Sequence, residues 1–317
     1  GPELEYFYFK DAEGTQVLDH GSYFDLTSLD SASDLRRDTV LTLEKMGIPV
    51  EYSHHEKGPS QHEIDLRYAD ALSMADAVMT YKQVVKEIAM KHGVYASFMP
   101  KPMADAPGNG MHVHQSLMDR SGNNVFFDPD DPSGYNLSAT AKSYIAGLLK
   151  YAPEYTLVTN QYVNSYKRLQ PGGEAPTCIS WGARNRSTLV RIPGYRPNSE
   201  SACRVELRSP DPACNPYLAI GLVLAAGLDG IENRMELSAP VNRNLFIPGE
   251  AAGLGLETLP ASLEEAVEVA QNSEFLHKFL PDELSRRYYA EALRRCEALK
   301  NASDPAEYER VHYFNAI

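Results

Sequence analysis

The chain has 317 residues, of which 43% are hydrophobic and 23% are charged, so a large core is expected and a disordered polypeptide is excluded. Forty-three acidic residues against thirty basic ones give a net charge of −13, which argues against nucleic acids and anionic membranes as main partners. The four cysteines lack paired spacing, no apolar stretch is long enough to span a bilayer, and no signal peptide is visible. We therefore expect a cytoplasmic protein.

The sequence of the first third of the chain predicts a strand, a helix, a hairpin and a second helix. Residues 3–9 alternate acidic and aromatic side chains at their start, which places Glu3 and Glu5 on one face of a strand. Residues 48–68 indicate two strands with a turn at Gly58 and Pro59. Helical spacing is found at 31–47 and at about 69–93, where Gly93 is a good helix end.

The remaining segments alternate between helical patterns and short strands. Helices are predicted near 136–158, 215–236, 262–274 and 282–299. Strands are predicted at 94–102, 111–118, 187–192 and 203–209. Because hairpins and long helices are interleaved without a strict strand and helix alternation, we expect an α+β fold with an antiparallel β-sheet backed by helices.

Five groups of polar side chains are candidates for chemistry. They are Glu3 with Glu5; His54 to Glu56 facing His62 and Glu63; His112 with His114; Arg204, Glu206 and Arg208; and Arg168, Glu174, Arg186 and Arg191. Carboxylates with an occasional imidazole are ligands that magnesium and manganese prefer. Each group also has a structural interpretation, such as a solvated strand face, hydrogen-bonded histidines or an ion-pair ladder.

The usual nucleotide motifs are missing from the sequence. It has no P-loop, and Gly108-Asn109-Gly110 does not precede a helix as a dinucleotide fingerprint requires. A nucleotide site must therefore be unconventional, built from backbone N–H groups and from arginines that bind phosphates in forked pairs.

Six segments resemble the glutamine synthetase family in their order and spacing. They are GPELEYFYF (1–9), HHEKGPSQHEID (54–65), KPMADAPGNGMHVHQS (101–116), NSYKRLQPGGEAP (164–176), ARNRSTLVRIP (183–193) and the segment from Arg204 to Ile231. The resemblance implies a glutamine synthetase/guanido kinase-like catalytic domain over residues 1–317. It also implies that the family's N-terminal β-grasp domain is absent from this chain, and that the full-length protein is a homo-dodecamer of two hexameric rings.

The same resemblance implies roles for individual residues. Glu5, Glu56 and Glu63 match the ligands of one Mg²⁺ or Mn²⁺ ion, and Glu3, His112 and Glu206 match those of a second. Substrate glutamate is matched to Gly108, Arg168 and Arg208, and the co-substrate ATP to Ser116, Arg186, Arg191 and Arg204. Glu174 matches a catalytic flap residue that takes a proton from the incoming nitrogen, and Arg186 matches a catalytic residue that binds phosphate.

The implied activity is an ATP-dependent ligase that forms glutamine from glutamate and ammonia through γ-glutamyl phosphate. Pro107 and Gly173 depart from the family's usual residues, and both changes occur in relatives that use other amines. A γ-glutamylpolyamine or other amine synthetase is therefore the alternative. A non-catalytic, ring-forming scaffold is a second alternative, which the complete set of six ligand positions disfavours because buried unpaired carboxylates are costly.

Overall fold

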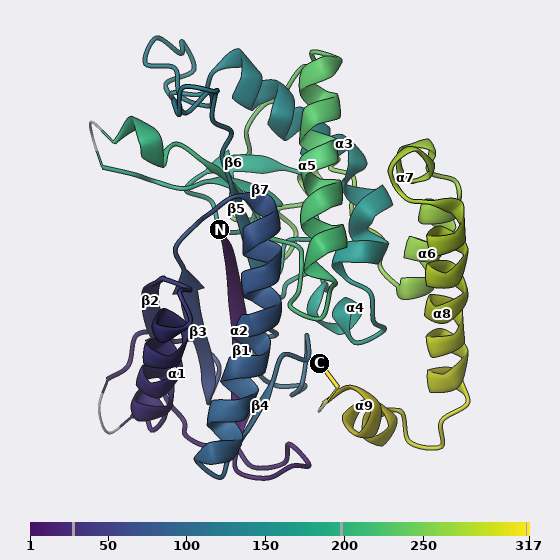
Figure 1. The fold of residues 1–317 in the computed structure, drawn as a ribbon. Helices are drawn as coiled ribbons and strands as arrows, with labels where there is room; N and C mark the ends of the chain where they lie inside the picture. Colours follow the sequence, from purple (N-terminus) through teal and green to yellow (C-terminus); the bar gives the residue numbers. More distant parts are fainter. Residues whose placement is uncertain (27–28, 197–198, 315) are drawn as a thin grey trace.

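The computed structural model describes residues 1–26, 29–196, 199–314 and 316–317. Within these ranges, eight strands form one sheet in the order β2-β3-β1-β5-β8-β7-β6, and β4 pairs with β1 beside this path (Figure 1). The strands are β1 (Pro2–Phe9), β2 (Val50–His55), β3 (Gln61–Leu66), β4 (Tyr95–Ser97), β5 (Met111–Gln115), β6 (Trp181–Ala183), β7 (Val190–Ile192) and β8 (Val205–Leu207).

Helices back this sheet. They are α1 (Ser33–Lys45), α2 (Ala71–Lys91), α3 (Ala139–Thr159), α4 (Ser165–Arg168), α5 (Pro216–Glu232), α6 (Leu263–Gln271), α7 (Glu274–Phe279), α8 (Asp282–Lys300) and α9 (Pro305–Tyr313). In Figure 1, α3 and α5 lie between α1 and α2 on one side and α6 and α8 on the other. None of the helices in the described ranges is long and apolar enough to cross a membrane.

The predicted α+β class, with a mostly antiparallel sheet backed by helices, is confirmed. The predicted hairpin corresponds to β2 and β3, and α2 ends before Gly93, whose φ of +73° suits glycine. Besides β6, α4 and α9, which were not predicted, two details differ from the prediction. Strands β6 and β7 pair in parallel, and the segment expected to be a single helix near 262–274 ends at Gln271, after which Ser273 caps the separate helix α7.

The two faces of β1 have different partners, as the alternation of its sequence predicts. Leu4, Tyr6 and Tyr8 are completely buried, and the Tyr6 ring meets Tyr81 of α2 edge to face at 6.3 Å. The hydroxyl of Tyr81 also donates to the carbonyl of Leu4 at 3.2 Å. The opposite face, which carries Glu3 and Glu5, is therefore presented on a strand that is fixed from behind.

Helices α3 and α5 pack so closely that only glycine fits at their crossing. A Cβ atom at Gly147 of α3 would collide with the backbone carbonyl of Ala226, and its next neighbours are backbone atoms of Gly230. Backbone atoms cannot move aside as a flexible side chain can, so the crossing depends on the missing side chain.

We predict that Gly147→Ala destabilises the protein by about 1–3 kcal/mol, because overpacking a rigid contact carries that cost. Gly221→Ala is the matched control. It lies in α5 with open space at its Cβ position, so the same substitution is expected to stabilise the helix by about 0.5–1 kcal/mol. Urea denaturation of the two variants measures both effects, and equal stability would contradict the proposed packing.

Candidate active site

One face of the sheet collects ionisable side chains from neighbouring strands. Glu5 of β1 lies directly opposite Glu63 of β3, and Glu3 lies between Asp65 of β3 and His112 of β5. The row continues from His114 of β5 to Glu206 of β8 and then to Arg191 of β7. Residues paired across adjacent strands point to the same face, so this register builds the cluster from short segments that are far apart in the chain.

The structure brings both predicted ligand sets together. In each set, Glu5 with Glu56 and Glu63 and Glu3 with His112 and Glu206, one potential ligand atom per residue lies within 4.8 Å of those of the other two. Oxygen donors with a single imidazole suit Mg²⁺ and Mn²⁺ better than the thiolate-rich or histidine-rich sets that zinc prefers. The donor sets therefore fit the expected ions.

The first set contains carboxylates that repel one another. Burial, together with the nearby charge of Glu56, raises the pKa of Glu5 to about 8. Burial and the adjacent Asp65 raise the pKa of Glu63 well above its ordinary range. Glu5 still accepts a hydrogen bond from the N–H of Gly110 at 2.7 Å. The protein thus holds these oxygens together against their mutual repulsion, which a divalent cation would relieve.

The second set is compensated by positive charge. Glu206 is fully buried and forms ion pairs with Arg191 and Arg208. Burial alone would raise the pKa of Glu206, but Arg208 is the largest of the opposing influences that hold it at about 2. Burial and Arg208 lower the pKa of His112 to about 4, so this imidazole is neutral near pH 7 and retains a lone pair for a cation.

Two further side chains join the clusters and were not assigned a role from the sequence. His54 forms a third group with Glu63 and Asp65, and its Nδ1 lies 3.5 Å from Glu56. Asp65 shares a face with Glu63 because the two are separated by one residue in β3. This same-face spacing was visible in the sequence motif HEID and would have found Asp65.

The residues predicted to hold glutamate lie beside the first set. Arg168 is buried and donates to the carbonyls of Ser209 at 2.7 Å and Arg208 at 3.2 Å. Gly108 packs so closely on the side chain of Arg168 that a Cβ would approach its Cγ to 2.9 Å. Arg208 is engaged by Glu206 and by the carbonyl of Arg186, to which its Nε donates at 3.0 Å.

The predicted flap and phosphate residues are more exposed. Glu174 is about half exposed and forms an ion pair with Lys57, the residue that follows Glu56. Arg186 is exposed and donates to the hydroxyl of Tyr23 at 3.4 Å, with its guanidinium 5.9 Å from the ring centre. Neither contact was predicted, because Tyr23 and Lys57 are distant in the sequence from their partners and no spacing rule relates them.

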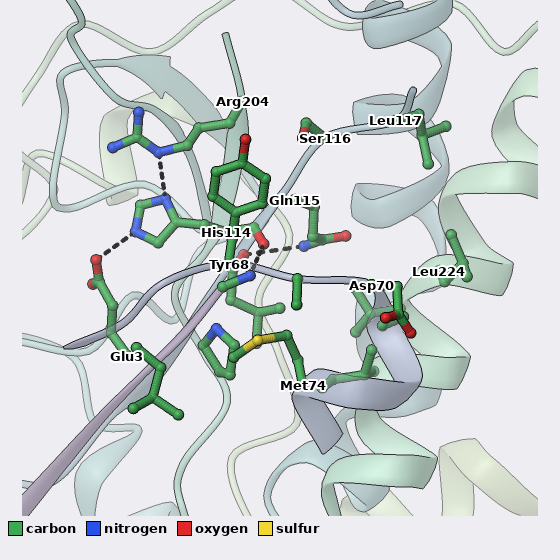
Figure 2. Close-up of a pocket in the computed structure, with 18 of the residues that line it drawn as sticks. Glu3, Tyr68, Asp70, Met74, His114, Gln115, Ser116, Leu117, Arg204 and Leu224 are labelled. Atoms are coloured by element: carbon green, nitrogen blue, oxygen red, sulfur yellow. Dashed lines mark hydrogen bonds and ion pairs between the residues drawn. The ribbon is translucent and has the colours of Figure 1, made fainter. Parts of the chain in front are cut away.

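A cavity of about 650 Å³ lies next to the second set. Figure 2 shows its polar end, where Nε2 of His114 lies 2.7 Å from Glu3 and Nδ1 accepts from Arg204 at 3.0 Å. Ser116 and Arg204, both predicted to bind the nucleotide, line this cavity. Tyr68 stands beside His114 at this polar end, and the other side of the cavity is formed mainly by apolar groups, which include Met74, Leu117 and Leu224.

A mostly antiparallel sheet that presents buried carboxylates beside a half-apolar cavity is the arrangement of a metal-dependent enzyme domain. The family model for the glutamine synthetase catalytic domain matches residues 1–313. The chain therefore belongs to the glutamine synthetase family, whose members are ligases that generally use ATP and divalent metals.

Individual relatives agree with this assignment. The chain is 50% identical to the glutamine synthetase of Methanosarcina mazei over 98% of its own length and 69% of that protein. It is 48% identical to the glutamine synthetase of Mycolicibacterium smegmatis over 99% and 71% of the two lengths. Solved structures of GmaS without ligand and in a GmaS/ADP complex each match with a TM-score of 0.86 and 33% identity, over 98% of this chain and 71% of GmaS.

Divalent cations should stabilise the protein more at pH 8 than at pH 6. The folded-state pKa of Glu5 is about 8 against an ordinary 4.5, so the stability linked to its protonated form is fully present below about pH 4.5 and is lost as the pH rises through 8. A bound cation removes this loss because it favours the carboxylate. Thermal denaturation with EDTA or Mn²⁺ at the two pH values measures the difference.

Glu5→Gln is the control for this measurement, since an amide does not titrate. Its EDTA-treated form should show a flatter dependence of melting temperature on pH. A stabilisation by Mn²⁺ that is the same at pH 6 and pH 8 in the unsubstituted protein would contradict the assignment of Glu5 to a cation site.

Proposed function

We propose that residues 1–317 form one catalytic domain that joins glutamate to ammonia with hydrolysis of ATP, through γ-glutamyl phosphate. The observation that carries this proposal is the pair of adjacent carboxylate clusters, one of which borders the cavity that contains Ser116 and Arg204. The relatives at about 50% identity, all named glutamine synthetase, support the reaction class.

The proposed nucleotide position follows from the two ends of the cavity. The apolar side with Met74, Leu117 and Leu224 suits a purine, and the end with Arg204 and Glu3 suits phosphates accompanied by cations. The GmaS/ADP complex among the similar structures supports a nucleotide site in this fold. Magnesium or manganese ions bound at the clusters would neutralise the phosphoryl charge that builds up during transfer.

In the proposed reaction, Arg168 and Gly108 hold substrate glutamate beside the clusters, and Arg208 faces its side-chain carboxylate. An oxygen of that carboxylate attacks the γ-phosphorus of ATP, and ADP leaves. Arg191 and Arg208 already lie at Glu206, so a cation near Glu206 would free both guanidinium groups for the phosphoryl oxygens and the carboxylate. Arg186 is proposed to meet the phosphate from the exposed side.

In the second proposed step, the nitrogen of the amine attacks the acyl carbon, phosphate leaves, and Glu174 takes the surplus proton. The ion pair with Lys57 holds Glu174 beside Glu56 and so supports its place at the acceptor site. Lys57 is exposed and its charge is offset by that of Glu174, so this ion pair does not by itself favour one amine over another.

Ammonia is preferred over a polyamine as nitrogen donor in this proposal because the relatives at about 50% identity are named glutamine synthetase. Another amine is the second candidate for the nitrogen donor. Two observations support it: the structural similarity to GmaS, a related ligase, and the unusual residues Pro107 and Gly173. The assembly of twelve subunits in two rings is part of the same proposal and rests on the family resemblance. The purified enzyme should therefore elute as an oligomer in size-exclusion chromatography.

The nitrogen donor is tested by phosphate release with glutamate, ATP and Mg²⁺, comparing ammonium with putrescine, spermine and ethanolamine. We expect kcat/KM to be highest for ammonium, since this ratio measures differential binding of the transition states. A far higher kcat/KM for a polyamine than for ammonium would contradict the proposal and identify the enzyme as a γ-glutamylpolyamine synthetase.

Glu206→Gln should abolish turnover, because it removes a predicted cation ligand and the shared partner of Arg191 and Arg208. The loss is expected to exceed about a hundredfold in kcat, as for the removal of a charged group that acts directly on phosphoryl transfer. Glu250→Gln, which loses only an exposed 3.4 Å contact with Arg243, is the control. Unchanged activity of Glu206→Gln at low metal concentration would refute the assigned role.

A further inference from the structure

A second buried polar cluster lies behind the hairpin that carries Glu56 and Glu63. His54 pairs with Glu63 across β2 and β3, so both face the carboxylate clusters. The next pair, His55 with His62, therefore points to the opposite side of the sheet, where both rings are completely buried. Asp19 meets them there, with Oδ1 2.9 Å from Nε2 of His55.

Asp19, His55 and His62 have the composition of a metal site, and their potential ligand atoms lie within 4.8 Å of one another. Their hydrogen bonds contradict that interpretation. His55 faces acceptors with both nitrogens, since Nδ1 lies 2.6 Å from the carbonyl of Glu56 and Nε2 faces Asp19. Both nitrogens must therefore donate, which makes His55 an imidazolium with no lone pair for a cation.

His62 is also unable to offer its free nitrogen to a metal ion. Its Nδ1 lies 2.9 Å from NH1 of Arg36, and an arginine can only donate. The proton of a neutral His62 ring is therefore on Nε2, which is buried and has no hydrogen-bond partner. Arg36 is itself held by Asp30, with 2.6 Å between NH2 and Oδ2. The cluster thus consists of two sets of hydrogen bonds, Asp19 with His55 and His62 with Arg36 and Asp30, whose histidine rings are in contact.

Asp19 is the point where several segments meet. Its Oδ1 accepts from the backbone N–H groups of Gly21 and Ser60, each at 3.1 Å, and its Oδ2 accepts from the N–H of Ser31 at 3.1 Å. The hydroxyl of Ser60, in the turn between β2 and β3, accepts from the N–H of Asp19 at 2.7 Å. One buried carboxylate therefore ties the hairpin turn to the loop that follows β1.

This network reaches the candidate active site through two bonds. The Nδ1 of His55 donates to the carbonyl of Glu56, and the carbonyl of His55 accepts from the N–H of Phe24 at 3.0 Å. The ring of Phe24 stacks on His54 with 4.5 Å between centroids, and His54 lies between Glu56 and Glu63 at 3.5 and 3.9 Å. Tyr23, which precedes Phe24 in this loop, contacts Arg186.

We propose that Asp19 and His55 are positioning residues for the first cation site, where their charge-assisted pair fixes the backbone of Glu56 and the ring of His54 from behind the sheet. The proposal rests on the proposed function in one respect, because it takes Glu56 as a ligand. Glu56 is intermediate in burial and follows the end of β2, where its N–H still donates to the carbonyl of Gln61 at 2.7 Å. The His55 bond holds the carbonyl of the same residue, so it fixes the peptide group on the other side of Glu56.

The test compares Mn²⁺ binding by the purified enzyme, without nucleotide, with its melting temperature in EDTA. Two variants address different bonds. Asp19→Asn removes the negative charge of the carboxylate that accepts from His55 and from three backbone N–H groups. His55→Gln keeps an N–H donor near the place of Nε2 but has none at the place of Nδ1, so it specifically removes the bond to Glu56. Both variants should weaken Mn²⁺ binding at one site about tenfold, as loss of supporting bonds around metal ligands does.

Asp131→Asn is the matched control for a merely structural effect. Asp131 is also buried, and it accepts from Ser133 and Leu137 N–H groups and from Lys142, none of which belongs to the site. It should lower the melting temperature without changing Mn²⁺ affinity. The positioning role is wrong if His55→Gln, or Asp19→Asn when it folds, lowers the melting temperature and leaves Mn²⁺ affinity unchanged, as Asp131→Asn does. If Asp19→Asn does not fold, the result for His55→Gln alone decides.

Glu5→Gln, measured beside these variants, separates this inference from the proposed function. If Glu5→Gln weakens Mn²⁺ binding and His55→Gln does not, only the positioning role fails. If neither substitution changes Mn²⁺ binding, the carboxylate cluster is not a cation site, and the proposed function fails with it.

Discussion

Carboxylates on neighbouring strands of this protein lie closer together than their charges favour. Glu5 and Glu63 are directly opposite one another in an antiparallel pair, where like charges destabilise the sheet. Their pKa values are raised because burial and the neighbouring carboxylates both oppose ionisation. Such a site persists only if other contacts hold the strands in register. Much of the remaining structure can be understood as the means of meeting that requirement.

The support comes from the reverse side of the sheet. The aromatic face of β1 packs on α2, and the hairpin of β2 and β3 is held by the network of Asp19, His55 and Arg36. These contacts involve groups that do not titrate near neutral pH or that are paired with an opposite charge. The strain of the acidic face is therefore opposed by apolar packing and charge-assisted hydrogen bonds that a change in cation occupancy does not directly alter.

Much of this arrangement was predictable from local patterns, and the rest depends on distant partners. Period-two alternation placed Glu3 and Glu5 on one face, and the turn at Gly58 gave the hairpin that carries Glu63. The short strand β6 was missed because three residues show no periodicity, and α9 was missed although Asp304 and Pro305 form a helix start. Contacts such as Lys57 with Glu174 join unrelated motifs, so no spacing rule reveals them.

The two clusters differ in what a cation would do. Among the described residues, no lysine or arginine forms an ion pair with Glu5 or Glu63, so a cation there would mainly relieve repulsion. At Glu206, Arg191 and Arg208 already supply positive charge, so a cation would instead compete with them. If a cation released them, the two arginines would be fork-shaped donors suited to phosphate and carboxylate. The same sheet face thus combines one cluster in which a cation would favour ionisation with another in which a cation would change the partners of two arginines.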